Sequence, residues 1–373
     1  MIAIIGSHPA AASLRSVGEV LTKAGEAVEF WDETRPEPGM VPMLADEDAA
    51  LEGVAGYYEW WRDHCCAGGQ VNPIGPWAPE GMPSTEVARR WIAHWMRKVE
   101  RHRPRVVVTW GSVHLPSRAA LRALGRLHGR EGETRGVCIE EGLFPAREGR
   151  SLMIDAGASY YEGWAIERAI MDFRAAGGSL GGAERKARLD EYASWWRGNR
   201  RTKHEAHVGD AELPDKWYWS YSNLVVFGQV PWDAAVWAAD PAGHAWGRMV
   251  QEARREREVW FKPHPRWPHN PTGLPSLPAD ASIHRLLPRM RGGAAVSSGV
   301  IYELALAEVP VAAYGQIKCP SSRGLVWSLE DLDTWEDSWL QGARWDLLGW
   351  LIHEYQATTA DPGRLVARIH GEW

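Results

Sequence analysis

The sequence predicts an α/β protein of two domains, each built around a parallel sheet with crossover helices. The chain has 373 residues, too many for one ordinary domain and about right for two domains of roughly 150 residues each. Short apolar segments alternate with helical patterns along most of its length. Hydrophobic residues make up 45% and charged residues 24%, a balance that is typical of a globular protein and excludes disorder, collagen and a coiled coil.

The first domain is expected to span residues 1–160. The segment from Met1 to Gly6 has no basic residues before its apolar run, so it predicts a first strand rather than a signal peptide. Apolar residues recur with helical spacing from Ala88 to Val99, in a helix that begins near Ser84 and that Pro104 ends. The domain is predicted to contain strands at 2–6, 27–31, 105–110 and 136–141 and helices at 11–24, 84–103 and 116–127.

The second domain is expected to span residues 221–334, with strands at 223–229, 258–262, 293–297 and 309–315. Residues 161–220 are charged and helical in pattern, which predicts a linker or insertion, and the glycines at 177, 178, 181 and 182 predict a loop within it. Residues 335–373 are Trp-rich and helical, and we expect them to pack back across the two domains.

Composition limits the classes of function. The net charge of −6 argues against a basic nucleic-acid surface, and no apolar stretch reaches the roughly 18 residues of a membrane span. Four cysteines do not make a disulfide scaffold in a chain of this length. We expect a cytoplasmic protein that contacts the inner membrane, if at all, only peripherally.

Tryptophan is unusually frequent, with 23 residues against 10 Tyr and 5 Phe. Two interpretations stay open. Mutational bias is one, because only 7 of the 42 basic residues are Lys. The other is a set of stacking surfaces for sugar rings or bases.

Polar residues follow most of the predicted strands. Open parallel sheets bind ligands at the carboxyl ends of their strands, so these residues predict a site in a cleft between the domains. In the first domain they are Ser7, His8, Gly111, Ser112, Glu140, Glu141 and Gly142, and in the second Gln229, Asp233, His264, Ser297 and Ser298.

The best-defined local unit is a strand, the segment Ser297-Ser298-Gly299, and a helix. A helix N-terminus offers unpaired N–H groups and a partial positive charge to a phosphate. Glu303, one turn into the helix, is placed to accept hydrogen bonds from ribose hydroxyls. The alternative is that Ser297 or Ser298 merely caps the helix.

A second unit, Lys262-Pro263-His264-Pro265, places a cation and an imidazole on a stiff turn after a strand. The two prolines fix the backbone, so the His264 ring is presented rather than mobile. Its expected task is to hydrogen-bond a phosphate leaving group, as a charged donor or as a general acid.

Two carboxylates could carry glycosyl transfer, which needs a nucleophile or ion stabiliser and an acid/base. Asp233 follows a strand of the second domain and Glu140 ends a strand of the first. The alternatives are an Asp that complements a helix dipole and a solvated strand end. The Asp-x-Asp pairs at 46 and 48 and at 331 and 333 lie in helical or turn contexts, so no metal or other cofactor is expected.

The order of these motifs resembles the capsule polysaccharide biosynthesis family, which includes retaining β-Kdo transferases of bacterial capsules and lipopolysaccharide. The resemblance extends from about residue 105 to 325. It rests on the segments at 139–145, 154–157, 228–233, 262–265 and 297–306, with Pro310, Val311 and Gly315 behind them.

The resemblance implies two Rossmann-like domains in a GT-B-like arrangement with a central cleft, CMP-β-Kdo as donor, and no metal. It implies Asp233 as nucleophile and Glu140 as acid/base. The nucleotide would be held by Lys262, His264, Ser297, Ser298, Gly299 and Glu303, with Gln229, Asp155, Glu141 and Gly111 in supporting positions. Ala234 and Ala235 are apolar where family members tend to be polar.

The expected function is therefore a retaining glycosyltransferase that moves Kdo, or a related 2-keto sugar acid, from a CMP-activated donor to a glycan or glycolipid acceptor. Three alternatives stay open. They are a transferase for another nucleotide sugar, a transferase for a polyol phosphate such as that of CDP-glycerol, and an inactive homologue that binds glycans through its indoles.

Overall fold

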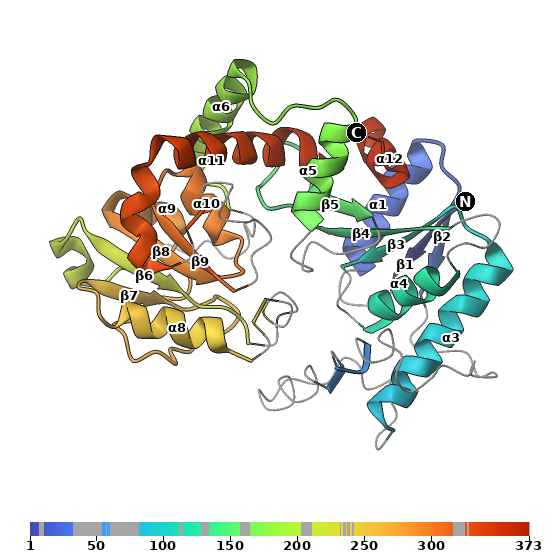
Figure 1. The fold of residues 1–373 in the computed structure, drawn as a ribbon, viewed down its shortest axis with the longest axis horizontal. Coiled ribbons are helices and arrows are strands. Elements are labelled where there is room, and N and C mark those ends of the chain that lie inside the picture. The colour runs from blue at the N-terminus through green and yellow to red at the C-terminus, as the bar shows by residue number, and fades with distance from the viewer. Residues whose placement is uncertain are drawn as a thin grey trace. The chain divides into compact units, whose positions relative to one another are not determined.

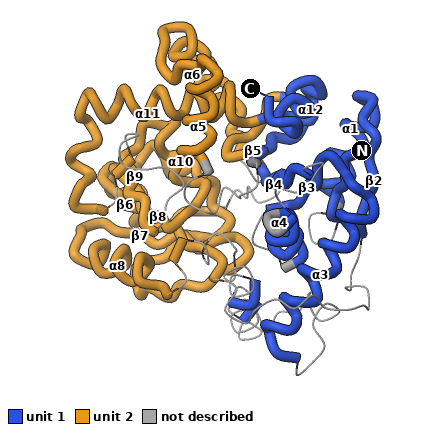
Figure 2. Tube along the Cα trace, turned by 45° about the vertical axis from the view of Figure 1, so that its right-hand side comes forward, with its two compact units in different colours: residues 1–141, 148–165, 357–373 blue, residues 142–147, 166–356 orange. Residues whose placement is uncertain are grey.

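The computed structural model forms two compact units, which are described separately (Figure 2). Unit 1 comprises residues 1–141, 148–165 and 357–373, and unit 2 comprises residues 142–147 and 166–356. The structure describes residues 1–6, 11–32, 54–56, 58–59, 82–111, 115–127, 134–156, 165–202, 211–231, 233, 236, 239–240, 242–315, 325–326 and 328–372.

Unit 1 is built on a six-stranded sheet of order β10-β5-β4-β3-β1-β2. The four predicted strands are confirmed as β1 (Ile2–Ile5), β2 (Val28–Trp31), β3 (Val106–Trp110) and β4 (Arg135–Glu141), and they pair in parallel. Two antiparallel strands that were not predicted, β5 (Ser151–Ala156) and β10 (Ala357–Thr358), extend the sheet beyond β4.

Helices cover this sheet and close its core (Figure 1). They are α1 (Ala11–Lys23), α3 (Ser84–His102), α4 (Leu115–Leu127) and α12 (Pro362–His370). Apolar residues of α1 and α12, among them Leu14 and Ile369, pack in one buried cluster with Ile4 of β1. Arg103 adopts a left-handed conformation at the end of α3, and the following Pro104 ends the helix as predicted.

Unit 2 is built on a four-stranded parallel sheet of order β7-β6-β8-β9. Its strands, β6 (Asn223–Phe227), β7 (Val259–Lys262), β8 (Met290–Val296) and β9 (Val311–Tyr314), confirm the four predicted ones. The chain passes from β6 to β7 on one side and then crosses to β8 on the other. Strand order therefore reverses between β6 and β8, the place where open sheets of this class bind ligands.

The remaining elements of unit 2 include the predicted loop at residues 176–182, which joins two helices. Residues 161–220 were predicted as a linker or insertion, and those from residue 166 onward lie in this unit. Residues 357–373 lie in unit 1, because β10 completes its sheet and α12 its core. The helical elements are α5 (Ala165–Ala175), α6 (Ala183–Asn199), α8 (His244–Ala253), α9 (Ile283–Leu286), α10 (Val300–Leu306), α11 (Ser338–Trp350), the 3₁₀ helices η3 (Asp215–Trp219), η4 (Leu287–Arg289) and η6 (Leu329–Glu336), and the π-helical turn η7 (Leu351–Tyr355).

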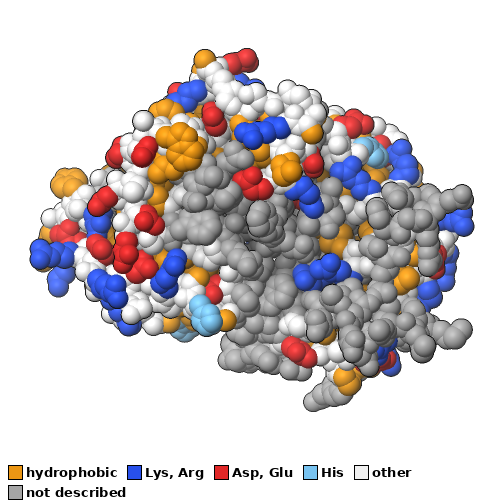
Figure 3. Space-filling view, in the orientation of Figure 1, with side chains coloured by type: hydrophobic (Ala, Val, Ile, Leu, Met, Phe, Trp, Pro, Cys, Tyr) orange, Lys and Arg blue, Asp and Glu red, His pale blue; other side chains and the backbone are white. Residues whose placement is uncertain are grey.

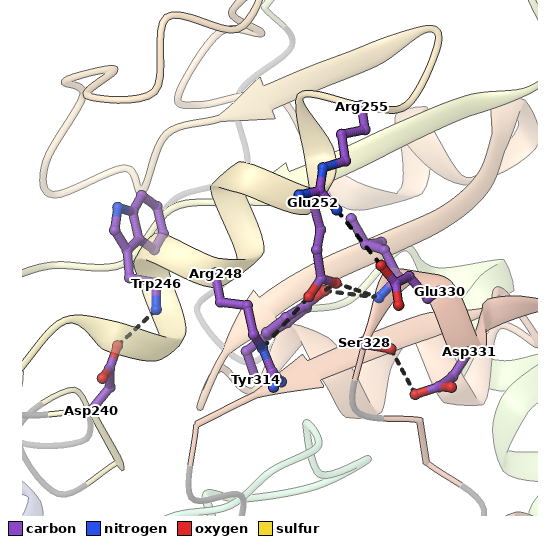
Figure 4. Close-up of polar contacts among 10 residues, drawn as sticks. Asp240, Trp246, Arg248, Glu252, Arg255, Tyr314, Ser328, Glu330 and Asp331 are labelled. Carbon is purple, nitrogen blue, oxygen red and sulfur yellow. Dashed lines mark hydrogen bonds and ion pairs between the residues drawn. The ribbon is translucent and has the colours of Figure 1, made fainter.

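A polar network holds α8 against β9 and η6 (Figure 4). Glu252 of α8 accepts hydrogen bonds from the Tyr314 hydroxyl and from the Leu329 backbone N–H, the latter at 3.2 Å. Burial, followed by the hydrogen bond to Glu252, raises the pKa of Tyr314. Asp240 accepts a hydrogen bond of 2.8 Å from the Trp246 N–H in the first turn of α8. These contacts anchor α8 near both of its ends.

Within the described ranges, no helix is both long enough and apolar enough to cross a membrane.

Candidate functional site

The carboxyl ends of β6, β7 and β8 meet at one edge of the unit 2 sheet. The Gly228 N–H donates to the Lys262 carbonyl at 2.8 Å, and the Gln229 side-chain amide donates to the Val296 carbonyl at 3.2 Å. A Cβ added to Gly228 would lie 3.2 Å from the His264 backbone nitrogen, tighter than an ordinary contact. The strand ends are thus packed closely enough that their polar residues are neighbours, as predicted from strand order.

Lys262 ends β7 as a buried cation. Its ammonium donates to the Ala279 carbonyl at 2.8 Å. Burial lowers the pKa of Lys262 to about 8, while the charges of Asp280 and Glu303 act in the opposite direction. The ammonium is therefore largely charged near neutral pH, in surroundings where its field is weakly screened.

His264 stands on the turn that follows β7. Its Nδ1 atom accepts a hydrogen bond of 3.1 Å from the Arg266 N–H, and its carbonyl accepts one of 2.9 Å from the Trp267 N–H. A ring whose Nδ1 accepts a hydrogen bond carries its proton on Nε2. In this arrangement Nε2 is the ring atom that can donate a hydrogen bond to a ligand.

The two serines after β8 have different environments. Ser298 accepts a hydrogen bond of 3.4 Å from the Val300 N–H in the turn that leads into α10, whose N-cap residue is Gly299. Ser297 is buried, and its backbone has a φ of 46°, in the left-handed region. Among the described residues, no group hydrogen-bonds its buried hydroxyl. An unmet buried hydroxyl costs about 1–3 kcal/mol, so Ser297 is the better candidate for ligand contact.

Glu303 lies on α10 and is buried. Its charge acts to raise the pKa of Lys262 and, after burial, that of Tyr192. The carboxylate is thus close enough to both side chains to influence their ionisation. Gly299 precedes the first residue of the same helix.

Asp233 lies in a turn just after β6. Its N–H donates to the Val230 carbonyl at 2.9 Å, and its own carbonyl accepts from the Val236 N–H at 2.9 Å. These bonds form a turn of the helical type expected there. The side chain is half-buried, and residues 232, 234 and 235 lie outside the described residues.

The candidate residues of unit 1 lie on β4 and β5 and directly after β3. Glu140 pairs with Met153 and Cys138 with Asp155 across the antiparallel β4–β5 ladder. Because paired residues share a face and side chains alternate along a strand, Glu140 and Asp155 are on the same face. Both are buried, so Glu140 is not the solvated strand end considered as its alternative.

Two supporting residues complete this part of unit 1. Gly111 follows β3 with a φ of 61°, a conformation that favours glycine, and its N–H donates to the Ile139 carbonyl at 2.9 Å. Glu141 is half-buried at the end of β4. Ser7, His8 and Ser112 lie outside the described residues.

The residues divide into two groups, one in each unit. In unit 2 the structure brings together Gln229, Lys262 and Glu303, with His264 and Ser297 beside them. Sequence reasoning missed Asp280, Ala279 and Tyr192, which influence or contact members of this group, because no motif marks them. In the described parts of the chain, no group of three or more His, Cys, Asp and Glu side chains is arranged to hold a metal ion. Asp331 accepts a hydrogen bond of 2.7 Å from the Ser328 hydroxyl.

Comparison with known proteins finds similarity in structure alone. No protein-family model matches the chain, and no curated protein matches it in sequence. The solved structure "Thermosulfurimonas dismutans KpsC, beta Kdo 2,4 transferase" is 17% identical, over 68% of this chain and 81% of that chain, with a TM-score of 0.50. The β-Kdo 2,7 transferase structure from KpsC of the same organism is 15% identical, over 71% of this chain and 82% of that chain, with a TM-score of 0.48.

A putative UDP-N-acetylglucosamine 2-epimerase from Listeria monocytogenes is 12% identical, over 99% of this chain and 94% of that chain, with a TM-score of 0.40. The likeness to the β-Kdo 2,4 transferase, together with two sheets that each contain four parallel strands, confirms the predicted fold class of two Rossmann-like α/β domains.

Proposed function

We propose that the chain is a glycosyltransferase that takes a sugar from a nucleotide-activated donor. The observation that carries the proposal is the meeting of three strand ends in unit 2. The Lys262 cation, the His264 N–H donor and the unsatisfied Ser297 hydroxyl lie at or just after the ends of β7 and β8, the two strands that flank β6 at this edge, and strand order reverses between β6 and β8. This is where open α/β sheets bind nucleotides, and the chain shares its fold with a sugar transferase.

In the proposed complex, the phosphate of the donor lies against these groups. His264 donates through Nε2–H, the Ser297 hydroxyl gains the partner it lacks, and the N–H groups at Ser298 and Gly299 face the phosphate. Lys262 contributes its positive charge to the site. Glu303 accepts hydrogen bonds from the ribose hydroxyls. A nucleoside monophosphate leaving group stabilised in this way needs no metal, so activity should survive EDTA.

For the transfer itself, we propose two displacements, which together give retention. A carboxylate oxygen of Asp233 attacks the anomeric carbon, and the bond to the phosphate oxygen breaks with its electron pair leaving on the nucleotide. Glu140 then takes the proton of an acceptor hydroxyl, whose oxygen attacks the same carbon and releases Asp233. Asp155, on the same face as Glu140, supports its orientation, as Gln229 supports the donor side.

The proposed donor is CMP-β-Kdo or the CMP form of a related 2-keto sugar acid, and the proposed acceptor is a glycan or glycolipid of a capsule or lipopolysaccharide pathway. The motif order from Glu140 to Glu303 supports this choice, as does the structural likeness to a β-Kdo transferase. With a net charge of −6, we expect no nucleic-acid partner.

The test is to incubate the purified protein with CMP-β-Kdo and follow CMP release and acceptor extension. Asp233→Ala should abolish both. Asp331→Ala is the matched control, because Asp331 is an exposed aspartate of the same unit whose side chain accepts a hydrogen bond from Ser328 in its local turn. Full activity in Asp233→Ala would refute the assigned nucleophile. Turnover of a UDP, GDP or CDP compound, but not of CMP-β-Kdo, would refute the proposed donor. Binding without turnover of any donor would refute the enzyme itself.

A further inference from the structure

A separate cavity lies at the other edge of the unit 2 sheet, where β6 and β7 begin. Its volume is about 430 Å³, and Asn223 and Val259, the first residues of these two strands, line it. Lys262 and Gln229 belong to the opposite edge, roughly 13 Å away along a five-residue strand. The cavity is therefore distinct from the candidate transfer site.

An exposed indole forms part of the wall of this cavity. Trp219 is 75% exposed, whereas Trp217, two residues earlier on η3, is fully buried and packs edge-on against Trp260 at 5.8 Å. The 3₁₀ helix turns about 120° per residue, so anchoring Trp217 in the core directs Trp219 away from it. The chain thus holds a large apolar ring in solvent at the rim of a cavity.

The polar groups that line the cavity are held in place by the protein. The Ser220 hydroxyl donates to Glu258 at 2.6 Å, Arg254 donates to the Thr272 carbonyl at 2.6 Å, and the Trp260 indole N–H donates to the Asn223 side chain at 2.9 Å. A ligand would meet these groups already oriented, which reduces the entropy lost on binding.

The charges in the lining balance. Lys216 and Arg254 are opposed by Glu256 and Glu258, so the cavity offers donors and acceptors without a net charge that would select a phosphate or a carboxylate. Acidic and basic side chains are also interspersed over unit 2 on the face seen in Figure 3. A neutral ligand rich in hydroxyl groups matches this lining.

We propose that this cavity is a second saccharide-binding site, which takes a neutral sugar ring of an oligosaccharide. The C–H face of the ring stacks on Trp219, and its hydroxyls hydrogen-bond Glu258 and Arg254. The volume falls within the range of small-ligand pockets, about 300–1,000 Å³. Such a site holds a glycan chain away from the transfer chemistry, and binding there needs neither donor nor turnover.

The test uses the full-length protein without donor, on an array of neutral oligosaccharides that includes maltohexaose, cellohexaose, chitohexaose and galacto-oligosaccharides, with calorimetry for any sugar bound. We expect at least one sugar to bind, and Trp219→Ala to weaken it at least about tenfold. Trp339→Ala is the matched control, because Trp339 is 65% exposed in the same unit and lines a different cavity; it should leave the affinity unchanged. An unaltered circular dichroism spectrum shows that each variant is folded.

Three results would overturn the inference. They are no binding by any sugar of the array, loss of binding in Trp339→Ala instead of Trp219→Ala, and Trp219-dependent binding of CMP in place of sugar. Asp233→Ala should bind the oligosaccharide as the unmodified protein does. Failure of the proposed transfer reaction can therefore be distinguished from failure of this inference.

Discussion

Replacing Lys262 by Met should make the protein more stable and impair its ligand binding. Burial lowers the pKa of Lys262 from 10.5 to about 8. Each pKa unit corresponds to about 1.4 kcal/mol, so the buried charge costs the folded state about 3 kcal/mol at neutral pH. Met removes this cost but also the hydrogen bond to the Ala279 carbonyl, which is worth about 1 kcal/mol. The net gain in the free energy of unfolding near pH 7 is about 2 kcal/mol.

The gain should disappear in alkali. Between the two pKa values the unfolded chain binds more protons than the folded protein, so the free energy of unfolding of the unmodified protein rises with pH in this window. Near pH 10, Lys262 is already neutral in the folded state, and Lys262→Met should be no more stable than the unmodified protein. Urea unfolding followed by circular dichroism at both pH values measures the two differences.

Lys216→Met is the matched control, because Lys216 is an exposed lysine of the same unit and its loss should change stability by no more than about 0.5 kcal/mol. A Lys262→Met protein that is less stable than the unmodified one at neutral pH would refute the reasoning. A stability difference that is the same at both pH values would refute it as well.

The same substitution tests the function assigned to Lys262. Calorimetry with CMP should show affinity that falls as the pH rises through about 8, because the ammonium loses its charge there. Lys262→Met should bind CMP at least about tenfold more weakly at neutral pH and lose this pH dependence. Equal affinity in the two proteins would remove Lys262 from the nucleotide site.

Further predictions concern packing, acid stability and the buried hydroxyl. Gly228→Ala presses a methyl group against the Phe261 ring at 2.8 Å and the His264 backbone nitrogen at 3.2 Å, and it should lower the free energy of unfolding by about 1–3 kcal/mol. Gly247→Ala, in open space on α8, should raise the free energy of unfolding by about 0.5–1 kcal/mol. Urea unfolding in which the two glycine substitutions change this free energy in the same direction would contradict the reasoning. The pKa of Glu26 is lowered chiefly by its hydrogen bond to His370, so its stabilisation is present above pH 4.5 and lost as the pH falls through the lowered value. His370→Ala should reduce the free energy of unfolding by less than about 1 kcal/mol and make it fall less steeply as the pH drops. Acid unfolding curves that are the same for the variant and the unmodified protein would argue against the contact. Ser297→Ala removes an unmet buried hydroxyl and should raise the free energy of unfolding by about 1 kcal/mol while it weakens CMP binding in calorimetry; unchanged binding would exclude the hydroxyl as a ligand contact.

The parallel strands of both units were predictable because each is a short apolar run between helical segments. The run from Val106 to Val108 is an example, since its side chains are buried and the run signals a strand covered on both faces. Helix ends were also predictable, because they depend on neighbouring residues, as at Arg103 and Pro104. Antiparallel β5 and β10 were not predictable, because β10 has only two residues and its pairing with β5 joins segments about 200 residues apart.

The candidate site shows the same division. The gathering of Gln229, Lys262 and Ser297 followed from the rule that parallel strands bring their carboxyl ends to one edge. Asp155 came only through the family resemblance, because its place beside Glu140 depends on the β4–β5 register. Which nitrogen of His264 carries the proton depends on the Arg266 N–H, a contact that no residue pattern specifies.

The sequence by itself determined that the chain forms two α/β domains and which residues follow their strands, because apolar runs, helical spacing and Pro or Gly stops act over a few residues. It left two interpretations of the 23 tryptophans open, mutational bias and stacking surfaces. The tertiary structure alone decided that Trp217 is fully buried and Trp219 is 75% exposed beside a cavity. The physical reason is that burial is set by contacts with residues distant in the chain, here Trp260 of β7, whereas composition records only how many indoles are present.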